Sequence, residues 1–545
     1  DPNATDINTG AGGGSDNTVR SCDITRTGQG GVFVGGGNRY RLTPGNNKVV
    51  NCDISDYAVI KRTYSPAVEL VGCGNSAERN EIYDAPHLAI QFKGNDMLIY
   101  GNDIHDVCYE TADCGAIYSV RRWSWQGTLV KNNFIHDLVN TGGIGSAAVY
   151  VDDLGSGVTM TENLFVNIPG YTTLFGGGRD NVITNNIQIN QGNGKGLHYD
   201  NRGQGWAWYH AAGPDGECYG ELVALRENAD YDAEVWNAKY PGLAAIDLDT
   251  VSTRTDKGDG YKNYYSNAAM PANALIEKNI MVGVANPFGN VNSNVKSYGT
   301  FDEKTNVSYA IGTDIGLADA DSYDFDVLED SKIKEMMGDN HFHVEDMGLY
   351  NDAYRTLVET QLEAPVLSTP ADGEDGLIAT NGIRFTWEEV DGAGRYKLEI
   401  ASDPAFENIV KTVSTEAVTV SVNGLEKETT YYWRVTARES AVNGVQSSSG
   451  VRSFTTSFVE DPSFFEGFRN FDEWEIFEDA GGSKGTPSNT TANAHSGRYS
   501  YELNEGMDVI QKVFGTKHND VASVWLYDNM NKGRGAAAIV QVTRE

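Results

Sequence analysis

Basic residues are scarce in this sequence of 545 residues. It contains 42 Lys and Arg against 76 Asp and Glu, which gives a formal net charge of −34. Nucleic acids and anionic membrane surfaces bind proteins through local positive charge, so the excess of acid argues against both as partners. No apolar run is long enough to span a membrane. The length predicts two to four domains, and we expect a monomer.

Cysteine and proline are also few, with six Cys and 14 Pro. The cysteines lack the CxxC pairing of common zinc motifs, although their even number permits disulfides. Cys22 and Cys52 occupy equivalent places in two similar segments, which favours a stack or a disulfide over catalysis. By contrast, 61 glycines among Asn and β-branched residues predict many tight turns between strands.

A short motif with Asn or Cys before an apolar residue recurs at intervals of roughly 20 to 30 residues, as in solenoid repeats. Its copies are SCDI (21–24), NCDI (51–54), RNEI (79–82), GNDI (101–104), NNFI (132–135), ENLF (162–165) and TNNI (184–187). A later KNIM places Ile280 in the same role after a long insertion. The leucine spacing of leucine-rich repeats is absent, so the period predicts a parallel β-solenoid with Asn ladders between coils.

The composition changes at three points along the chain. We expect a solenoid over residues 1–362, with a helix-like insertion at about 203–275 that caps or walls one side. Short alternating strands over 363–457, with Trp387 early and Tyr432–Trp433–Arg434 late, resemble a fibronectin type III β-sandwich. The last segment, 458–545, predicts an incomplete β-sandwich, perhaps of the carbohydrate-binding kind. The predicted class is therefore all-β.

Alternation along strands predicts which side chains leave the solenoid. Val149 and Val151 in AAVYVDD should point inward, and Tyr150 and Asp152 outward. Two outward columns follow across the coils: Gln91, Tyr118, Tyr150, Phe175 and His198, and beside them Lys93, Val120, Asp152, Gly177 and Asp200. Aromatic rings beside carboxylates on one face are typical of a sugar-binding groove. Asp113 precedes its strand, so alternation does not fix the side to which it points, and its position is undecided by one turn.

Several of these residues have an ordinary structural explanation. An Asp near a solenoid turn usually binds backbone, and Tyr118 over Tyr150 can be an exposed ladder. The repeated pairs His105–Asp106 and His136–Asp137 follow the inward Ile of their coils, which predicts stacked turn residues. The pairs Asp247/Asp249 and Asp324/Asp326 are candidates for calcium, although the chemistry considered below requires no cofactor or metal.

An ordered set of motifs over roughly residues 80–285 carries a family resemblance: DCGAIY, RRW, NNFIHD, VYVDDLGSG, ENLFVNI, GGGRDN, HYDNRGQGWA and WNAKYPGL. The set resembles secreted right-handed parallel β-helix proteins that include glycoside hydrolase family 141. Known members of that family are α-L-fucosidases or xylanases acting on plant cell-wall glycans. The run RRWSW departs from the family's single Arg–Trp pair preceded by glycine.

The resemblance implies a right-handed β-helix and catalysis by paired carboxylates. The implied catalytic residues are Asp113, Asp152 and Asp153, with the choice between the last two left open. The expected substrate-binding residues are Tyr118, Arg121, Arg122, Trp123, Tyr150, Arg179, Asp180, His198, Asp200, Arg202 and Trp206.

The leading hypothesis is an extracellular glycoside hydrolase, secreted or attached to the cell surface, that cleaves a polysaccharide or oligosaccharide. A polysaccharide lyase is the second hypothesis, with calcium and with Lys93, Arg122 and Asp152 in its site. The third is a glycan-binding adhesin without catalysis. Clustering of aromatic, acidic and basic groups on one face favours an enzyme over an adhesin.

Overall fold

The computed structural model describes residues 14–139, 142, 145–207, 217–246, 248, 269–320, 323–357, 362–377, 379, 382–439 and 445–456, and four short strands beyond them. The chain divides into two compact units, Asp1–Glu359 with Ala441–Asn443, and Thr360–Ser440 with Gly444–Glu545. Each unit is described by itself.

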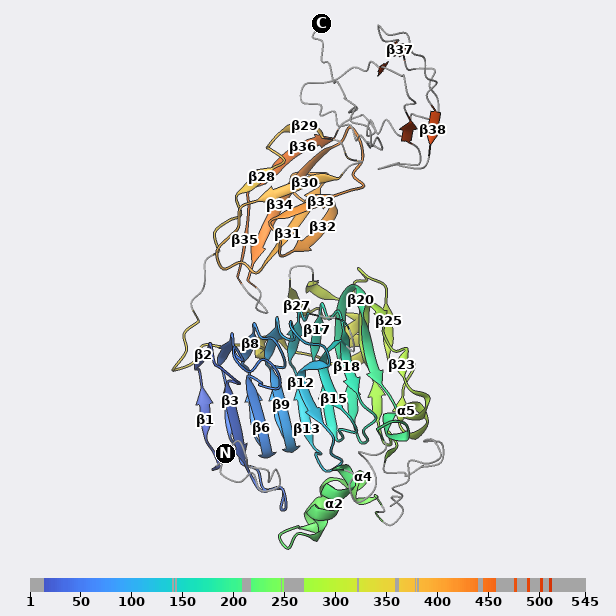
Figure 1. Ribbon diagram of the computed structural model, residues 1–545. Coiled ribbons are helices and arrows are strands. Elements are labelled where there is room, and N and C mark those ends of the chain that lie inside the picture. The colour runs from blue at the N-terminus through green and yellow to red at the C-terminus, as the bar shows by residue number, and fades with distance from the viewer. Residues whose placement is uncertain are drawn as a thin grey trace, which may run out of the picture. The chain divides into compact units, whose positions relative to one another are not determined.

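The first unit is a parallel β-helix with three faces, each a stack of strands from successive coils (Figure 1). The first face contains β1 (Thr18–Arg20), β4 (Lys48–Val50), β7 (Ser76–Glu78), β10 (Leu98–Tyr100), β13 (Thr128–Lys131), β16 (Val158–Thr161), β19 (Val182–Thr184), β21 (Leu275–Glu277) and β24 (Thr300–Phe301). The second contains β2 (Asp23–Thr25), β5 (Asp53–Ser55), β8 (Glu81–Tyr83), β11 (Asp103–His105), β14 (Phe134–His136), β17 (Leu164–Val166), the start of β20 (Ile187–Tyr199), β22 (Ile280–Asn286) and β25 (Val307–Tyr309).

The third face carries the residues of functional interest. It contains β3 (Val32–Gly36), β6 (Val68–Cys73), β9 (Ile90–Asn95), β12 (Cys114–Val120), β15 (Ser146–Asp152), β18 (Tyr171–Phe175), the end of β20, and β23 (Asn290–Val291). The predicted all-β class and parallel solenoid are confirmed, because every pairing among these strands is parallel.

The interior is filled by the inward apolar side chains of the strands and closed at a corner by a ladder of asparagines. Ile54, Ile82, Ile104, Ile135 and Phe165 are fully buried and stack coil upon coil. Each ladder Asn donates from its side-chain amide to the side-chain oxygen of the next, at 2.8 to 3.0 Å, through Asn80, Asn102, Asn133, Asn163, Asn186, Asn279 and Asn306. These bonds satisfy buried amides and fix the register between coils.

The ladder corrects one part of the predicted repeat. Because Asn186 pairs with Asn163, Ile187 lies against Leu164, and it is Gln188 that follows Phe165 in the inward column. Ile280 continues the Ile187 position rather than the Phe165 position. Aligning the repeats by their apolar residue misplaced this coil by one residue, which moves a side chain to the other side of the sheet.

The described residues of the predicted insertion contain three helices, α2 (Glu217–Glu227), α3 (Ala233–Lys239) and α4 (Pro241–Ala244), after a short 3₁₀ turn, η1 (Arg202–Gln204). Their buried Leu222, Trp236 and Leu243 form a second hydrophobic cluster with Trp123 and Leu154 from the turns of the β-helix. Asp232 caps α3 by accepting a hydrogen bond from the Val235 amide. The insertion therefore covers one corner of the coil stack.

A return segment, residues 323–357, runs back along the second face. The segment contains β27 (Asp324–Val327), α6 (Lys332–Met337) and η4 (Val344–Asp346). Before it in the chain come α5 (Ser293–Tyr298) and then β26 (Leu317–Asp319), which pairs with β27. Phe325, Ile333 and Phe342 pack on outward residues such as Phe134 and Ile187. Hydrogen bonds then join the segment to successively earlier coils: Tyr323 to Asp137, His343 to Asn132, Asp346 to Tyr100, Tyr350 to Asn51, and Asp352 to Ser21.

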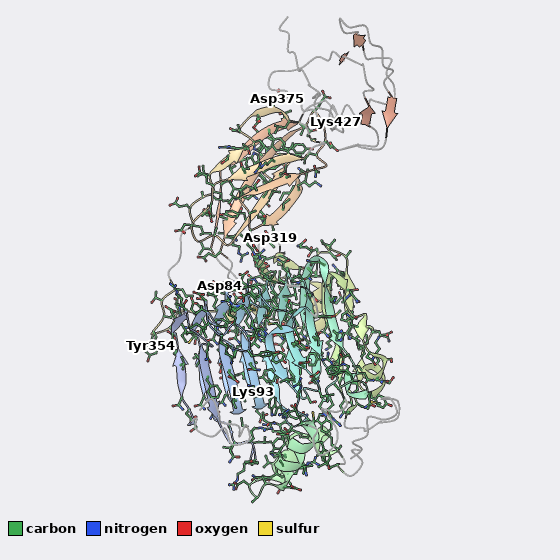
Figure 2. All side chains as sticks on the ribbon, in the orientation of Figure 1. Asp84, Lys93, Asp319, Tyr354, Asp375 and Lys427 are labelled. Carbon is green, nitrogen blue, oxygen red and sulfur yellow. The ribbon has the colours of Figure 1, made fainter. Side chains whose placement is uncertain are left out.

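The second unit contains a β-sandwich over residues 362–456. One sheet contains β28 (Leu367–Thr369), β30 (Ile383–Trp387) and β33 (Thr419–Val422), and the other β29 (Glu374–Leu377), β31 (Arg395–Ala401), β32 (Ile409–Thr415), β34 (Thr430–Arg438), β35 (Gln446–Ser448) and β36 (Arg452–Thr456). Trp387 and Trp433 lie in the core between them. Figure 2 draws the side chains, with Lys93 on the β-helix and Asp375 on the sandwich.

Most of the last predicted segment, 458–545, lies outside the described residues. Four short strands are described there, in two antiparallel pairs: β37 (Glu475–Phe477) with β40 (Val509–Gln511), and β38 (Ser488–Thr490) with β39 (Ser500–Glu502).

Candidate active site

Two tyrosines from neighbouring coils form the centre of the third face. Ile117 pairs with Val149 and both point inward, so Tyr118 and Tyr150, which also pair, point outward. Their rings meet edge to face, with centroids 5.4 Å apart and planes at 88°. They are only 6 % and 3 % exposed, so polar groups packed against them have little water around them.

The column of outward residues follows the prediction except at one coil. Tyr118 pairs with Gln91 and with Tyr150, and the column continues through Leu174 to His198. Phe175 pairs with Val151 and is fully buried in the core, so its predicted outward place was wrong. Leu174 takes that place because β18 ends at Phe175, where three glycines follow.

Asp113 is on the same face as the tyrosines. It precedes β12 with a left-handed backbone (φ 60°), and its Oδ1 accepts a hydrogen bond of 3.0 Å from the Tyr150 hydroxyl. Asp tolerates that conformation better than most residues. The carboxyl is partly exposed, and the described residues place no donor on its Oδ2. One oxygen of Asp113 is therefore available to a ligand.

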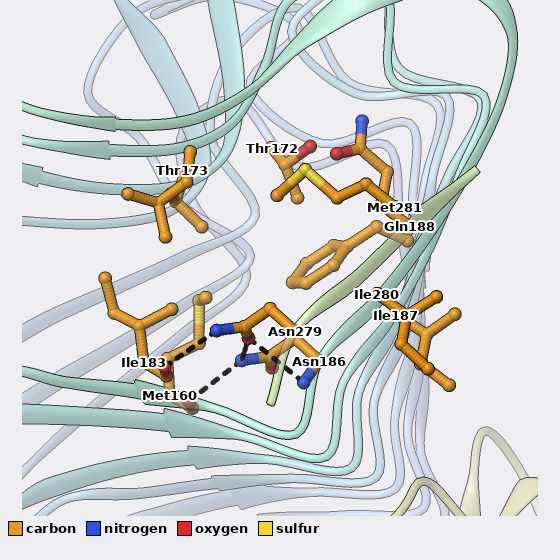
Figure 3. Close-up of a pocket in the computed structure, with 12 residues that line it drawn as sticks. Met160, Thr172, Thr173, Ile183, Asn186, Ile187, Gln188, Asn279, Ile280 and Met281 are labelled. Carbon is orange, nitrogen blue, oxygen red and sulfur yellow. Dashed lines mark hydrogen bonds between the residues drawn. The ribbon is translucent and has the colours of Figure 1, made fainter. Parts of the chain in front are cut away.

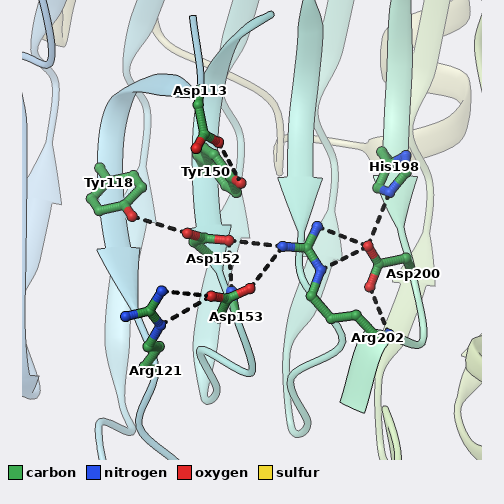
Figure 4. A network of polar contacts seen from close by, with 9 residues as sticks. All are labelled: Asp113, Tyr118, Arg121, Tyr150, Asp152, Asp153, His198, Asp200 and Arg202. Carbon is green, nitrogen blue, oxygen red and sulfur yellow. Dashed lines mark hydrogen bonds and ion pairs between the residues drawn. The ribbon is translucent and has the colours of Figure 1, made fainter. Parts of the chain in front are cut away.

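Asp152 ends β15 and is held from three sides (Figure 4). Oδ2 accepts a hydrogen bond of 3.0 Å from Tyr118, and Oδ1 accepts bonds of 2.8 Å from Arg202 Nη1 and 2.8 Å from the Asp153 amide. Burial and the neighbouring Asp153 charge raise the pKa of Asp152, although Arg202 and the tyrosine hydroxyls oppose them. Asp152 therefore keeps its proton to a higher pH than an ordinary Asp.

Asp153 is an anchor for two arginines. It is 2 % exposed, and its Oδ2 accepts from Arg121 Nε at 2.9 Å while its Oδ1 accepts from Arg202 Nη1 at 3.0 Å. Arg202 Nη1 thus contacts Asp152 and Asp153 at once. Such pairing compensates the cost of burying the Asp153 charge.

Asp200 completes the network on the far side of Arg202 (Figure 4). It accepts from the Arg202 amide and Nε, both at 2.9 Å, pairs with Nη2 at 2.8 Å, and lies 3.3 Å from His198 Nε2. Burial would raise the pKa of Asp200, but the His198 and Arg202 hydrogen bonds outweigh it and lower that pKa. Asp152 and Asp200, on either side of one guanidinium, thus shift in opposite directions.

Trp206 provides an exposed aromatic surface beside this network. Its side chain is 50 % exposed, and the Arg202 guanidinium lies 5.6 Å from its ring centroid. Tyr64 lies on the other side, half exposed, with its ring 6.2 Å from Tyr118 and 4.8 Å from His87. Tyr64 was not predicted, because it lies in a loop without strand alternation to give its direction.

Four predicted binding residues lie elsewhere. Trp123 is fully buried in the cluster under α2 to α4, which corrects its expected contact with substrate. Arg179 pairs with Asp180 at 3.0 Å and donates to the Gly242 carbonyl, so both tie the coil to the insertion. Arg122 pairs with Glu217 of α2 at 2.6 Å. None of these contacts reaches the Asp152 carboxyl.

Glu217 itself is a residue that the sequence did not indicate. It pairs with Arg122, and it lies 3.8 Å from Nη1 of Arg121, the residue whose Nε donates to Asp153. The helical insertion therefore supports the arginines of the site across about a hundred residues of sequence. Only a known contact between α2 and this coil could have revealed it.

The candidate calcium pairs add little to this site. Asp324 and Asp326 flank the buried Phe325 on β27, and the Asp326 amide donates to Asp324 Oδ1 at 3.3 Å. Asp247 and Asp249 lie outside the described residues.

A small cavity lies within the β-helix, behind the third face (Figure 3). Its lining includes Thr172, Thr173, Gln188, Leu197 and Met281. Leu197 is an inward residue, whereas its neighbour His198 belongs to the outward column. The cavity is therefore a feature of the core and is separate from the carboxylate network.

Comparison with protein families agrees with this architecture. Residues 9–188 match the family model for a right handed beta helix region. This part of the chain is a right-handed β-helix. No curated protein and no solved structure is significantly similar to the chain. The fold is common to glycoside hydrolases, lyases and adhesins, so function must be argued from the site.

Among the helices in the described part of the chain, none has the length and apolar character needed to cross a bilayer.

Proposed function

We propose that this protein is an extracellular glycoside hydrolase that acts on a complex, plant cell-wall-type polysaccharide or oligosaccharide. The observation that carries the proposal is the state of Asp152. It is buried and hydrogen-bonded by Tyr118, and its pKa is raised, while further carboxylates surround it on one face. Glycosidases need one carboxyl that stays protonated and one that is ionised.

Asp152 is the proposed general acid, which donates its proton to the glycosidic oxygen as the bond to the leaving sugar breaks. Its raised pKa keeps that proton available at higher pH than for an ordinary Asp. Asp113 is the proposed second carboxylate, which attacks the anomeric carbon or removes a proton from the attacking water. It is partly exposed and receives one hydrogen bond, from Tyr150.

Asp153 and Asp200 are positioning residues in this proposal. Asp153 is bound by Arg121 and Arg202, and Asp200 by Arg202 and His198, so their oxygens are already engaged. Together they hold the Arg202 guanidinium against Asp152. This assignment chooses Asp152 over Asp153 as the reacting acid.

Substrate class follows from the resemblance and from the aromatic surfaces. Trp206 and Tyr64 are about half exposed on either side of the carboxylates, where flat rings can pack against sugar C–H faces. The family resemblance points to α-L-fucosides or xylans. The proposed chemistry uses only side-chain carboxyls and requires no cofactor.

The lyase hypothesis is less well supported because its candidate bases are engaged. Lys93 pairs with Glu69 and Arg122 with Glu217. Both cations are therefore already occupied by ion pairs and are not free to approach a proton on a bound sugar. A lyase would release unsaturated products that absorb in the ultraviolet.

The test compares Asp152→Asn, Asp113→Asn and Asp153→Asn with the wild type on fucosylated and xylan-derived oligosaccharides, following reducing ends. Asp230→Asn is the matched control, because Asp230 is an exposed Asp that pairs with Arg41 away from the site. We expect Asp152→Asn and Asp113→Asn to lose about 10³-fold or more in kcat. Full turnover in both would refute the proposal, and binding without cleavage by the wild type would support an adhesin.

A further inference from the structure

A second cluster of chemically active side chains lies on the second face, outside the candidate active site. Ile104 and Ile135 point inward on β11 and β14, so Asp103, His105 and His136 point outward. One ligand atom from each lies within 4.8 Å of the others. All three are buried, at 1 %, 5 % and 0 % exposure. The imidazoles of His105 and His136 stack as the sequence predicted, with ring centroids 4.8 Å apart, but both residues lie in strands rather than in turns.

The hydrogen bonds orient both imidazoles toward one point. His105 Nδ1 lies 2.8 Å from an Asp106 carboxylate oxygen, and His136 Nδ1 lies 2.6 Å from an Asp137 oxygen. Each carboxylate can accept a hydrogen bond from Nδ1–H, which leaves Nε2 of each ring for other contacts. His136 Nε2 faces Asp103, and His105 Nε2 lies nearer to Glu81 of the preceding coil. Histidines that bind metals are held by carboxylates in this way.

The Nε2 atoms of His105 and His136 differ in their hydrogen-bond partners. His136 Nε2 lies 3.0 Å from Asp103 Oδ1, whereas the buried His105 Nε2 has no hydrogen-bond partner among the described residues. Glu81 Oε1 lies 3.6 Å from this nitrogen. A buried polar nitrogen without a partner is costly and indicates a missing ligand.

Negative charge dominates the surroundings. Glu81 and Asp103 occupy neighbouring positions on the adjacent strands β8 and β11. Asp106 and Asp137 contact the Nδ1 atoms of the two imidazoles. Asp53 extends the column beside Glu81. Like charges in adjacent coils repel, so a divalent cation at this point would compensate them better than a single proton.

We propose that Asp103, His105 and His136 hold a zinc-class divalent cation, with Glu81 as the fourth ligand. Two imidazole nitrogens and carboxylate oxygens are a donor set that suits Zn²⁺. Asp106 and Asp137 orient the imidazoles behind the ion. Binding displaces any proton on the two Nε2 atoms into solvent, so no other reactant is needed.

The residues around the cluster provide access from solvent on one side and a contact with the return segment on the other. Glu81 is 20 % exposed at its side chain, so the cluster opens to solvent on that side. On the other side Tyr323 of the return segment donates to Asp137 at 2.8 Å and packs on His136, with ring centroids 5.8 Å apart. The ion would therefore stiffen the point at which the return segment meets the coils.

The test uses the full chain produced in zinc-supplemented medium, and separately the chelator-treated chain titrated with Zn²⁺ or Co²⁺. We expect one ion per chain in the wild type, proton release on titration, and a Tm rise of about 5 °C with Zn²⁺. His105→Gln should lose the ion and the Tm rise, and Glu81→Gln should bind about 10- to 100-fold more weakly.

His343→Gln is the control, because His343 is a partly exposed histidine paired with Glu345 outside the cluster. Glu81→Gln, at the exposed edge, serves if the His105 variant does not fold. A wild type that retains no Zn²⁺ and shows no Tm rise would overturn the proposal, leaving a protonated histidine cluster. Zinc content unchanged in His105→Gln, or lost in His198→Gln instead, would also overturn it.

Discussion

The Tyr118 hydroxyl donates a hydrogen bond of 3.0 Å to Oδ2 of Asp152 on the next coil. This bond favours the ionised carboxylate and so lowers the pKa of Asp152, against the burial that raises it. Tyr118 thus limits how far the pKa of the proposed acid rises.

Removing the hydroxyl with Tyr118→Phe should raise the pKa of Asp152 further. The high-pH limb of the kcat/KM profile should then move to higher pH, while the low-pH limb stays in place. Tyr100→Phe is the matched control, because Tyr100 donates a similar bond of 2.9 Å to Asp346 far from the carboxylates. Identical profiles for wild type and Tyr118→Phe would contradict the assignment of Asp152 as the acid.

The pH profile of the wild type provides a second prediction. Asp152 acts when protonated, so activity should be present below its pKa and fall as pH rises through it. Because burial and Asp153 raise that pKa, the fall should come at higher pH than for an ordinary Asp. The measurement is kcat/KM against pH at constant ionic strength. A limb at the ordinary Asp value would contradict the raised pKa.

Arg202→Met should destabilise the β-helix strongly. It removes a guanidinium that contacts Asp152, Asp153 and Asp200 at once, so that the buried Asp152 loses its cation and Asp153 keeps only Arg121. We expect a loss of about 3 to 5 kcal/mol in the free energy of unfolding, measured by denaturant titration. Arg41→Met, which breaks the exposed pair with Asp230, should cost no more than about 1 kcal/mol. Equal losses in the two variants would refute this account.

Gln188→Met should stabilise the β-helix. Gln188 is 1 % exposed and borders the interior cavity, and neither its Oε1 nor its Nε2 has a hydrogen-bond partner within the described part of the chain. A thioether of similar shape removes that unmet polarity, which is worth about 1 to 3 kcal/mol. Thermal unfolding gives the comparison. Asn163→Leu, at a satisfied ladder position, should instead destabilise. A lower Tm for Gln188→Met would contradict the prediction.

The sequence predicted the elements whose cause is local. Strand alternation placed Tyr118, Tyr150 and Asp152 outward, because each coil repeats the same inward apolar position. It failed for Phe175 and Gln188, where the register depends on the neighbouring coil: glycines end β18, and the Asn186 ladder bond shifts the repeat by one. A one-residue shift reverses every side chain that follows.

The roles of other residues depend on segments far away in the chain. The sequence predicted Trp123 to be a substrate-binding residue, but the insertion covers its side chain. His136 looked like a turn residue, yet Tyr323 of the return segment packs on it. Burial of this kind arises from tertiary contacts, and a single sequence holds no local pattern that reports them.

The return segment changes how the β-helix should come apart. A stack of coils in which each contacts only its neighbours can fray from either end, one repeat at a time. Here the return segment is hydrogen-bonded in turn to the coils that contain Asp137, Tyr100, Asn51 and Ser21. The first coil therefore cannot open without releasing a segment that also holds the middle of the stack. The return segment therefore couples the opening of the first coil to that of the middle coils, so hydrogen exchange in the first coil should be nearly as slow as in the middle of the stack.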